Sequence, residues 1–376
     1  MKFIFWLSFI GAIYSYFVYP IILLLLPKRP KQAHVQENFL PAVTVIITAH
    51  NEQAKIKDKI LNTLSLDYPK ALVEILVASD ASTDKTNQIV LGMKAQGVRL
   101  VKVDERKGKE FAQLQAINEA KGEILIFSDV ATELKNNALN LLVDKFKDPR
   151  VGAISSEDRF LSKDGSVIGE GIYVKYEMWL RKLESKVHSL VGLSGSFFAA
   201  RKTVCDQWDF TVPSDFNTAL NCVRKGLVAS SDPQIVGYYK NIKQDKGEYI
   251  RKYRTVVRGI SAIAKKPDIL NPINFGFFSF QVWSHKIMRW LVPWFLILLL
   301  IASFAMLNKH WGYTFVLILQ VVFYCLVILG VTSETLRRKS FIRIPYYFIQ
   351  VNIAIAHALL AFLLGKRITI WEPTKR

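Results

Sequence analysis

An acid stands at the end of an apolar run in EILIFSDVATEL, residues 123–134. The apolar residues 124–127 predict a buried strand, and Asp129 stands where such a strand would emerge. A site that holds a metal-bound diphosphate usually offers a second oxygen ligand two residues later, since hard cations prefer oxygen. That second position is Ala131. Asp129 is therefore a candidate ligand for Mg²⁺ or Mn²⁺ in a site that lacks one expected side chain.

Two more charged side chains stand at the ends of predicted elements: Asp80 after a strand and Lys109 at the start of a helix. Asp80 comes directly after VEILVAS (73–79), and its carboxylate can accept hydrogen bonds from a nucleotide base or a ribose. Ser82 and Asp84 suit a helix cap, which is the alternative role for this cluster. Lys109 lies in KGKE (107–110) at the start of a predicted helix, where it can hold an anion such as diphosphate. A solvated run of charges is the alternative there.

Two later stretches also carry possible chemistry. VPSDFNTAL (212–220) places Asp215 at the start of an amphipathic helix, where a carboxylate is either a cap or a general base. EYIRKYRTVVRG (248–259) spaces Arg251, Arg254 and Arg258 on one helical face. Such a face can bind a diphosphate leaving group or the phosphate of a lipid.

The elements that must position these side chains alternate along the chain. Strands are expected at 43–48, 73–79, 98–103 and 123–129, and helices at 53–65, 83–96 and 107–121. This alternation predicts an α/β fold with a mainly parallel sheet and helices on both faces. Ligands bind such sheets beyond the carboxyl ends of the strands. The polar clusters TAHNE (48–52), SDASTD (79–84) and SDVAT (128–132) are expected to meet there.

The rest of the 376 residues points to a membrane. Hydrophobic residues make up 51% of the chain, and the mean hydropathy is +0.20. Four apolar runs, each near the length that a spanning helix needs, cover 3–26, 290–307, 311–330 and 344–364. The net charge is +19, but many cations flank these runs, as in PKRPK and RRKSFIR. That distribution favours anionic lipid over nucleic acid.

The basic flanks also predict an orientation. With PKRPK (27–31) inside the cell, residues 32–289 would be cytoplasmic at the inner membrane. Three further crossings would then leave the C-terminus outside, although its tail GKRITIWEPTKR is strongly basic. The two signals conflict, and one late segment can be interfacial instead of spanning. The three cysteines show neither metal-ligand spacing nor a disulfide framework.

Taken in order, these segments resemble the family 2 glycosyltransferases, inverting enzymes of the GT-A fold, in their membrane-anchored bacterial form. The likeness lies in TAHNE, LDYPKALVEILVASDASTDKT (66–86), KGKEFAQLQAINEAKGEILIFSD (107–129), GLSGSFFAARK (192–202), SHKIMRWLVP (284–293) and WEPTKR (371–376). The resemblance implies an N-terminal anchor (1–30), a cytoplasmic GT-A domain (41–265), an interfacial amphipathic segment (266–289), membrane helices (290–364) and a basic tail (365–376).

The resemblance also implies a role for each candidate residue. Ala49, Glu52, Asp80, Lys109 and Asp129 would bind the nucleotide part of a sugar donor, most readily a UDP-sugar. Asp129 would also hold Mg²⁺ or Mn²⁺. The remaining positions are the general base Asp215, the diphosphate-binding Arg254 and Arg258, and the acceptor-side Gly195 and Ser196.

Three positions depart from the family pattern. Ala131 stands where an acid or a neutral oxygen donor is usual, and Ser214 precedes Asp215 where an acid is common. Polymerising members carry Gln-x-x-Arg-Trp where this chain reads RKYRT (251–255), so only Arg254 is retained. We therefore expect an inverting transferase that moves a sugar to a lipid-linked or membrane-proximal glycan. A processive polysaccharide synthase and a non-catalytic subunit of a glycan-assembly complex are the alternatives.

Overall fold

The computed structural model describes residues 1–30, 39–161, 172–240 and 245–368. The chain divides into two compact units. The first, here called the helical unit, comprises Met1–Leu25, Gln244–Ser261 and Phe280–Ile368. The second, the sheet unit, contains Leu26–Lys243 and Ala262–Ser279. Each unit is described by itself.

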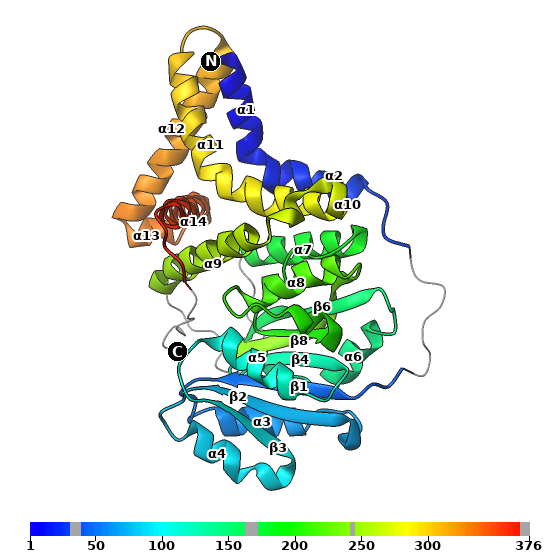
Figure 1. The fold of residues 1–376 in the computed structure, drawn as a ribbon. Coiled ribbons are helices and arrows are strands. Elements are labelled where there is room, and N and C mark those ends of the chain that lie inside the picture. The colour runs from blue at the N-terminus through cyan, green and yellow to red at the C-terminus, as the bar shows by residue number, and fades with distance from the viewer. Residues whose placement is uncertain (31–38, 162–171, 241–244, 369–376) are drawn as a thin grey trace. The chain divides into compact units, whose positions relative to one another are not determined.

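The sheet unit is built on an eight-stranded mixed sheet with the order β3-β2-β1-β4-β7-β6-β8-β5 (Figure 1). Its strands are β1 (Val43–Ala49), β2 (Val73–Asp80), β3 (Val98–Val103), β4 (Ile124–Asp129), β5 (Glu133–Leu134), β6 (Val151–Leu161), β7 (Phe197–Arg201) and β8 (Val228–Lys240). β1, β2, β3 and β4 pair in parallel, while β7 runs antiparallel to both β4 and β6. The expected mainly parallel α/β sheet is thereby confirmed.

Helices cover both faces of this sheet because side chains alternate along each strand. Val45 and Ile47 of β1 pack with α3 (Ile56–Leu64), α4 (Thr86–Gly92) and α6 (Ala138–Lys145) on one face. Ile46, between them, packs on the other face with α5 (Lys109–Glu119) and α8 (Ser214–Arg224). Both clusters are fully buried, so they fix the register that brings the strand ends together.

The predicted elements lie close to those observed, and all three predicted helices are shorter than expected, α5 by two residues at each end. α3 begins at Ile56 instead of residue 53, and α4 covers only Thr86–Gly92. The loop before α3 and the loop before α4 are joined by hydrogen bonds, which hold their residues outside the helices. A 3₁₀ turn at Lys94–Gln96 ends the second region, and Gly97 adopts a left-handed conformation there (φ 85°).

The helical unit contains apolar helices. The first is continuous over Lys2–Leu25, with α1 (Lys2–Ile13), a π-helical turn (Tyr14–Val18) and α2 (Tyr19–Leu25). The stretch Pro272–Ala305 begins in the sheet unit with most of α10 (Pro272–Val282) and continues in the helical unit as α11 (Met288–Ala305). It is followed by α12 (Trp311–Thr332) and α14 (Ser340–Leu363). All four stretches are long and apolar enough to cross a membrane.

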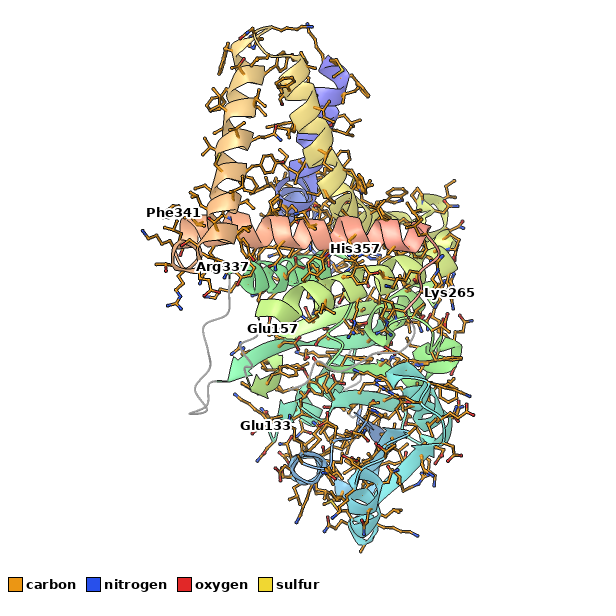
Figure 2. The ribbon with its side chains drawn as sticks, turned by 90° about the vertical axis from the view of Figure 1, so that its left-hand side faces the viewer. Glu133, Glu157, Lys265, Arg337, Phe341 and His357 are labelled. Carbon is orange, nitrogen blue, oxygen red and sulfur yellow. The ribbon has the colours of Figure 1, made fainter. Side chains whose placement is uncertain are left out.

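These helices do not all run in one direction. α1 packs on α11, where Phe5 meets Leu299 and Ala302. α11 and α12 lie side by side, whereas α14 runs across them: Figure 1 looks along its axis and Figure 2 shows it from the side, between Phe341 and His357. The last two helices, α9 (Asp245–Lys265) and α13 (Glu334–Arg337), complete the unit.

Candidate active site

The first two strand ends are joined through their loops. Asn51 adopts a left-handed conformation (φ 53°), and its side-chain oxygen accepts hydrogen bonds from the backbone N–H groups of Thr83 (2.8 Å) and Asp84 (3.4 Å). The backbone N–H of Glu52 donates to the Thr86 hydroxyl (2.8 Å). Residues 49–53 and 81–86 therefore form one rigid rim beyond β1 and β2. Ala49 is buried at the base of this rim.

Asp80 is placed to brace a turn. It is 3% exposed, and its carboxylate accepts hydrogen bonds from the backbone N–H groups of Lys107 (3.0 Å) and Gly108 (3.1 Å). Gly108 has φ 98°, a conformation that favours glycine, directly before α5 begins at Lys109. A buried carboxylate thus fixes the start of the helix that carries Lys109. The nucleotide contact of Asp80 stays a prediction.

Asp129 and Lys109 form an ion pair at the end of β4. Lys109 Nζ lies 2.5 Å from Asp129 Oδ1 and donates a second hydrogen bond to the carbonyl of Gly195 (2.7 Å). The backbone N–H of Asp129 donates to the carbonyl of Ser196 (2.9 Å). The expected diphosphate residues are therefore in direct contact with the expected acceptor-side residues.

Asp215 approaches the same segment from α8. A Cβ atom added to Gly195 would lie 3.2 Å from Asp215 Oδ2, so the carboxylate rests against the glycine backbone. Asp215 Oδ1 accepts a hydrogen bond from the backbone N–H of Phe216 (2.9 Å). The other carboxylate oxygen faces the backbone of Gly195, whose carbonyl accepts the hydrogen bond from Lys109. Gly195 therefore contacts both the candidate general base, Asp215, and Lys109, which is expected to bind the diphosphate.

The described residues offer a divalent cation only part of a coordination shell. In the described ranges no three His, Cys, Asp or Glu side chains converge as a metal site. Thr132 is buried, with its hydroxyl 3.2 Å from the Ser196 carbonyl, and Glu133 lies exposed on β5 (Figure 2). Asp129 therefore fits a cation if diphosphate oxygens supply the remaining ligands.

A buried lysine also belongs to this region, and the sequence reasoning missed it. Lys59 of α3 is 3% exposed, and its ammonium donates to the carbonyl of Thr132 (2.6 Å). Burial lowers the pKa of Lys59 to about 7, although the carboxylates of Asp129 and Glu133 act in the opposite direction. A signal was present, because Lys59 falls on the apolar face of α3 with Ile56 and Ile60.

The arginine helix belongs to the helical unit. Arg251 is exposed, Arg254 is half-buried and Arg258 is 4% exposed, so the three side chains differ although they share a helical spacing. The diphosphate contact of Arg254 and Arg258 stays a prediction. The C-terminal WEPTKR lies outside the described residues.

Part of the sheet unit is similar to known proteins. Residues 44–207 match the family model for glycosyl transferase family 2. The poly-beta-1,6-N-acetyl-D-glucosamine synthases of Staphylococcus aureus (strain COL) and Staphylococcus epidermidis are 28% and 26% identical over 205 and 216 residues. These alignments cover 53% and 55% of this chain. The chain spans about half the length of these curated relatives, 48% and 50% respectively.

A solved structure extends the comparison to the whole chain. A mannosyltransferase from Pyrobaculum calidifontis, in complex with GDP-Man and Mn²⁺, superposes with a TM-score of 0.72. The match covers 97% of this chain and 99% of that chain at 21% identity, which supports a shared fold. The mixed sheet with a terminal helix before it and apolar helices after it is thus a known arrangement. Residues 44–207 are therefore similar to glycosyl transferase family 2 domains, and the chain has a GT-A-like fold.

Proposed function

We propose that this protein is an inverting glycosyltransferase that moves a sugar from a nucleotide-sugar donor to a lipid-linked or membrane-proximal glycan. The observation that carries the proposal is that Gly195 lies against the Asp215 carboxylate and also accepts a hydrogen bond from Lys109, which pairs with Asp129. An inverting transfer needs a base on the acceptor side and a cationic group on the leaving side. The candidates for these two groups, Asp215 and Lys109, both contact Gly195.

Asp215 acts as the general base in the proposed reaction. Its carboxylate takes the proton from an acceptor hydroxyl while that oxygen forms a bond to the anomeric carbon. The bond from this carbon to the diphosphate oxygen breaks, and its electron pair leaves with the nucleoside diphosphate. Attack from the face opposite the leaving group inverts the configuration at the anomeric carbon.

Positively charged side chains stabilise the negative charge that develops on the departing diphosphate. Lys109 is positioned by Asp129 and the Gly195 carbonyl. Arg254 and Arg258 would add planar guanidinium groups, which suit phosphate oxygens. Such prepositioned cations stabilise developing negative charge in the transition state. Asp129 would hold Mg²⁺ or Mn²⁺ together with diphosphate oxygens, and the cation would neutralise charge on the leaving group.

The nucleotide occupies the rim beyond β1 and β2 in this proposal. Ala49, Glu52 and Asp80 contact its base and ribose, and a UDP-sugar is the first donor to try. The test is a screen of sugar nucleotides for release of the nucleoside diphosphate, with membrane lipids from bacterial cells as acceptors. Release with at least one donor, lost in Asp215→Asn, supports the proposal. No release with any donor, cation or lipid fraction contradicts it.

A processive polysaccharide synthase is the second candidate. The match to two poly-beta-1,6-N-acetyl-D-glucosamine synthases favours it. The sequence RKYRT at 251–255 speaks against it, because the expected Gln and Trp are absent. The length of the product made by the purified protein separates the two: one added sugar for a single transfer, or a ladder of sizes for a polymerase.

The membrane orientation belongs to the same proposal: the sheet unit is cytoplasmic, α1, α11 and α12 cross the bilayer, and α14 lies along its inner surface. α14 runs across α11 and α12 (Figure 2). Near its end, His357 contacts two tyrosines of the charged helix α9, Tyr249 through a 3.0 Å hydrogen bond and Tyr253 at 4.5 Å between rings. α9 carries four arginine or lysine residues within 251–258 and cannot lie in the hydrocarbon core.

An interfacial α14 also removes the conflict over the C-terminus. With three crossings, both RRK (337–339) and GKR (365–367) are cytoplasmic, as their charge favours. Cysteine labelling with an impermeant maleimide tests this, in a background without native cysteines. Lys309→Cys, between α11 and α12, should react in intact cells, and Lys366→Cys only after permeabilisation. Reaction of Lys366→Cys in intact cells would show that α14 spans the bilayer.

A further inference from the structure

A carboxylate that no part of the proposed mechanism uses lies beside the segment that joins base and diphosphate. Asp158 on β6 accepts three hydrogen bonds at Oδ1, from the hydroxyls of Ser194 (2.7 Å), Ser196 (3.1 Å) and Tyr239 (3.3 Å). Ser194 and Ser196 also contact each other through their hydroxyls (2.8 Å). A single oxygen therefore gathers two side chains of one short segment and one from β8.

The segment 193–196 reaches the candidate base on one side. The backbone N–H of Leu193 donates to the carbonyl of Asp215 (3.4 Å), and Gly195 lies against the Asp215 carboxylate. A guanidinium nitrogen of Arg181 donates to the Leu193 carbonyl (3.0 Å). A movement of this segment therefore changes the position of the general base relative to the reacting carbon.

The same segment also contacts Lys109 and Asp129, the pair expected to bind the diphosphate and its cation. The carbonyl of Gly195 accepts from Lys109, and that of Ser196 accepts from the backbone N–H of Asp129. The segment is thus the physical connection between the two halves of the site, and the serines on either side of Gly195 are the residues that Asp158 holds.

We propose that Asp158 is a positioning residue, which acts through Ser194 and Ser196 to fix the distance between Asp215 and the Lys109–Asp129 pair. This role rests on the proposed function. It differs from a catalytic role, because Asp158 touches neither donor nor acceptor in the proposed reaction. Misplacement of reacting groups by about 1 Å can lower a rate roughly 10²-fold, so a positioning residue can have a large effect.

The surroundings of Asp158 agree with an anchoring role. Its side chain retains some exposure, yet burial of the carboxylate raises its pKa, against the hydrogen bonds and the charge of Arg181 that favour the ionised form. Two further hydrogen bonds join the segment and β7 to β6: Ser194 N donates to the Ser155 hydroxyl (2.7 Å), and the Ser156 hydroxyl donates to the Phe197 carbonyl (2.7 Å). Loss of Asp158 should therefore loosen the serines without unfolding the sheet.

The test compares Asp158→Ala and Asp158→Asn in the full-length protein. Asparagine keeps an oxygen acceptor at the position of Oδ1, whereas alanine removes it. We expect Asp158→Ala to lower kcat for nucleoside diphosphate release roughly 10²-fold with little change in KM for the sugar nucleotide. Asp158→Asn should restore most of the rate. Asp148→Ala, which breaks an ion pair with Arg150 elsewhere in the sheet unit, is the matched control and should leave kcat unchanged.

Hydrogen exchange provides a readout that needs no substrate. The amides of residues 193–196 and of Asp129 should exchange faster in Asp158→Ala, while those of β1 and β2 keep the wild-type rate. Unchanged exchange in 193–196, or a wild-type kcat in Asp158→Ala, overturns the positioning role alone. If the wild-type protein releases no nucleoside diphosphate from any sugar nucleotide, the proposed function falls and this role falls with it. Equal losses of kcat in the alanine and asparagine variants would also refute anchoring through the Oδ1 hydrogen bonds.

Discussion

Replacement of Lys109 by methionine should move two affinities in opposite directions. The ammonium of Lys109 occupies Asp129 Oδ1 at 2.5 Å, on the one carboxylate proposed to bind the cation. In the protein without donor, Mn²⁺ must compete with this ammonium. Lys109→Met removes the competitor, so Mn²⁺ should bind the donor-free variant more tightly. A nucleoside diphosphate should bind more weakly, because it loses a cationic partner.

The size of both effects follows from the contact. A hydrogen bond to a charged group contributes about 1.5–3 kcal/mol, and 1.4 kcal/mol is tenfold in a dissociation constant. The side chains of Lys109 and Asp129 are 19% and 33% exposed, so solvent screening favours the lower end of this range. We therefore expect roughly a tenfold gain for Mn²⁺ and roughly a tenfold loss for the nucleotide.

Calorimetry measures both affinities, with MnCl₂ titrated in the absence of nucleotide and UDP or GDP titrated in the presence of Mn²⁺. Lys107→Met is the matched control. That lysine is 48% exposed, pairs with Glu105 at 3.2 Å and should change neither value by much. Weaker Mn²⁺ binding to the donor-free Lys109→Met protein would refute the reasoning, because it would show that Lys109 supports the cation instead of competing with it.

Three further changes give distinct outcomes. Ala131→Asp should tighten Mn²⁺ binding without nucleotide, as an added carboxylate supplies a ligand; unchanged calorimetric affinity would show that residue 131 does not face the cation. Lys59 has a folded-state pKa of about 7, below the ordinary 10.5, so the unfolded chain binds more protons between these values and stability should rise with pH across that window, by at most about 1.4 kcal/mol per pH unit. Thermal unfolding of Lys59→Met should lack this rise, and an equal rise would exclude Lys59 as its source. Arg254→Lys should slow transfer in the same lipid, since lysine loses the planar fork; equal rates would indicate contact with lipid phosphate only.

Local patterns predicted the first half of the sheet well. The apolar runs at 43–48, 73–79, 98–103 and 123–129 became β1, β2, β3 and β4 almost without shift. β1, β2 and β4 are central strands with buried side chains on both faces, whereas β3 is an edge strand with exposed positions. The strand-end polar clusters met as expected for parallel strands. Their carboxyl ends lie at one edge, so position along the chain was sufficient to bring Asp80 and Asp129 to the same side of the sheet.

The second half of the site depended on pairings that no local pattern contains. Asp158 meets Ser196 and Tyr239, which lie 38 and 81 residues away, only because the sheet order places β6 between β7 and β8. The hydrogen bond from Gly108 to Asp80 spans 28 residues, and it gives this carboxylate a structural role beside the nucleotide contact proposed for it. No role was predicted for Lys59, although it is a charged residue on the apolar face of a helix.

The general base is the central element of this account, and Asp215→Asn tests it directly. A general base contributes roughly 10²- to 10⁴-fold to a rate. Asparagine keeps the side-chain oxygen that accepts from the backbone N–H of Phe216, so the fold should be retained. The measurement is the rate of sugar transfer by Asp215→Asn and by the wild-type protein under saturating donor, with nucleotide affinity measured on the same samples. We expect a loss of transfer within that range and an unchanged affinity for the nucleoside diphosphate. Transfer at the wild-type rate would contradict it, because Asp215 would then be a helix-terminal residue and not the base.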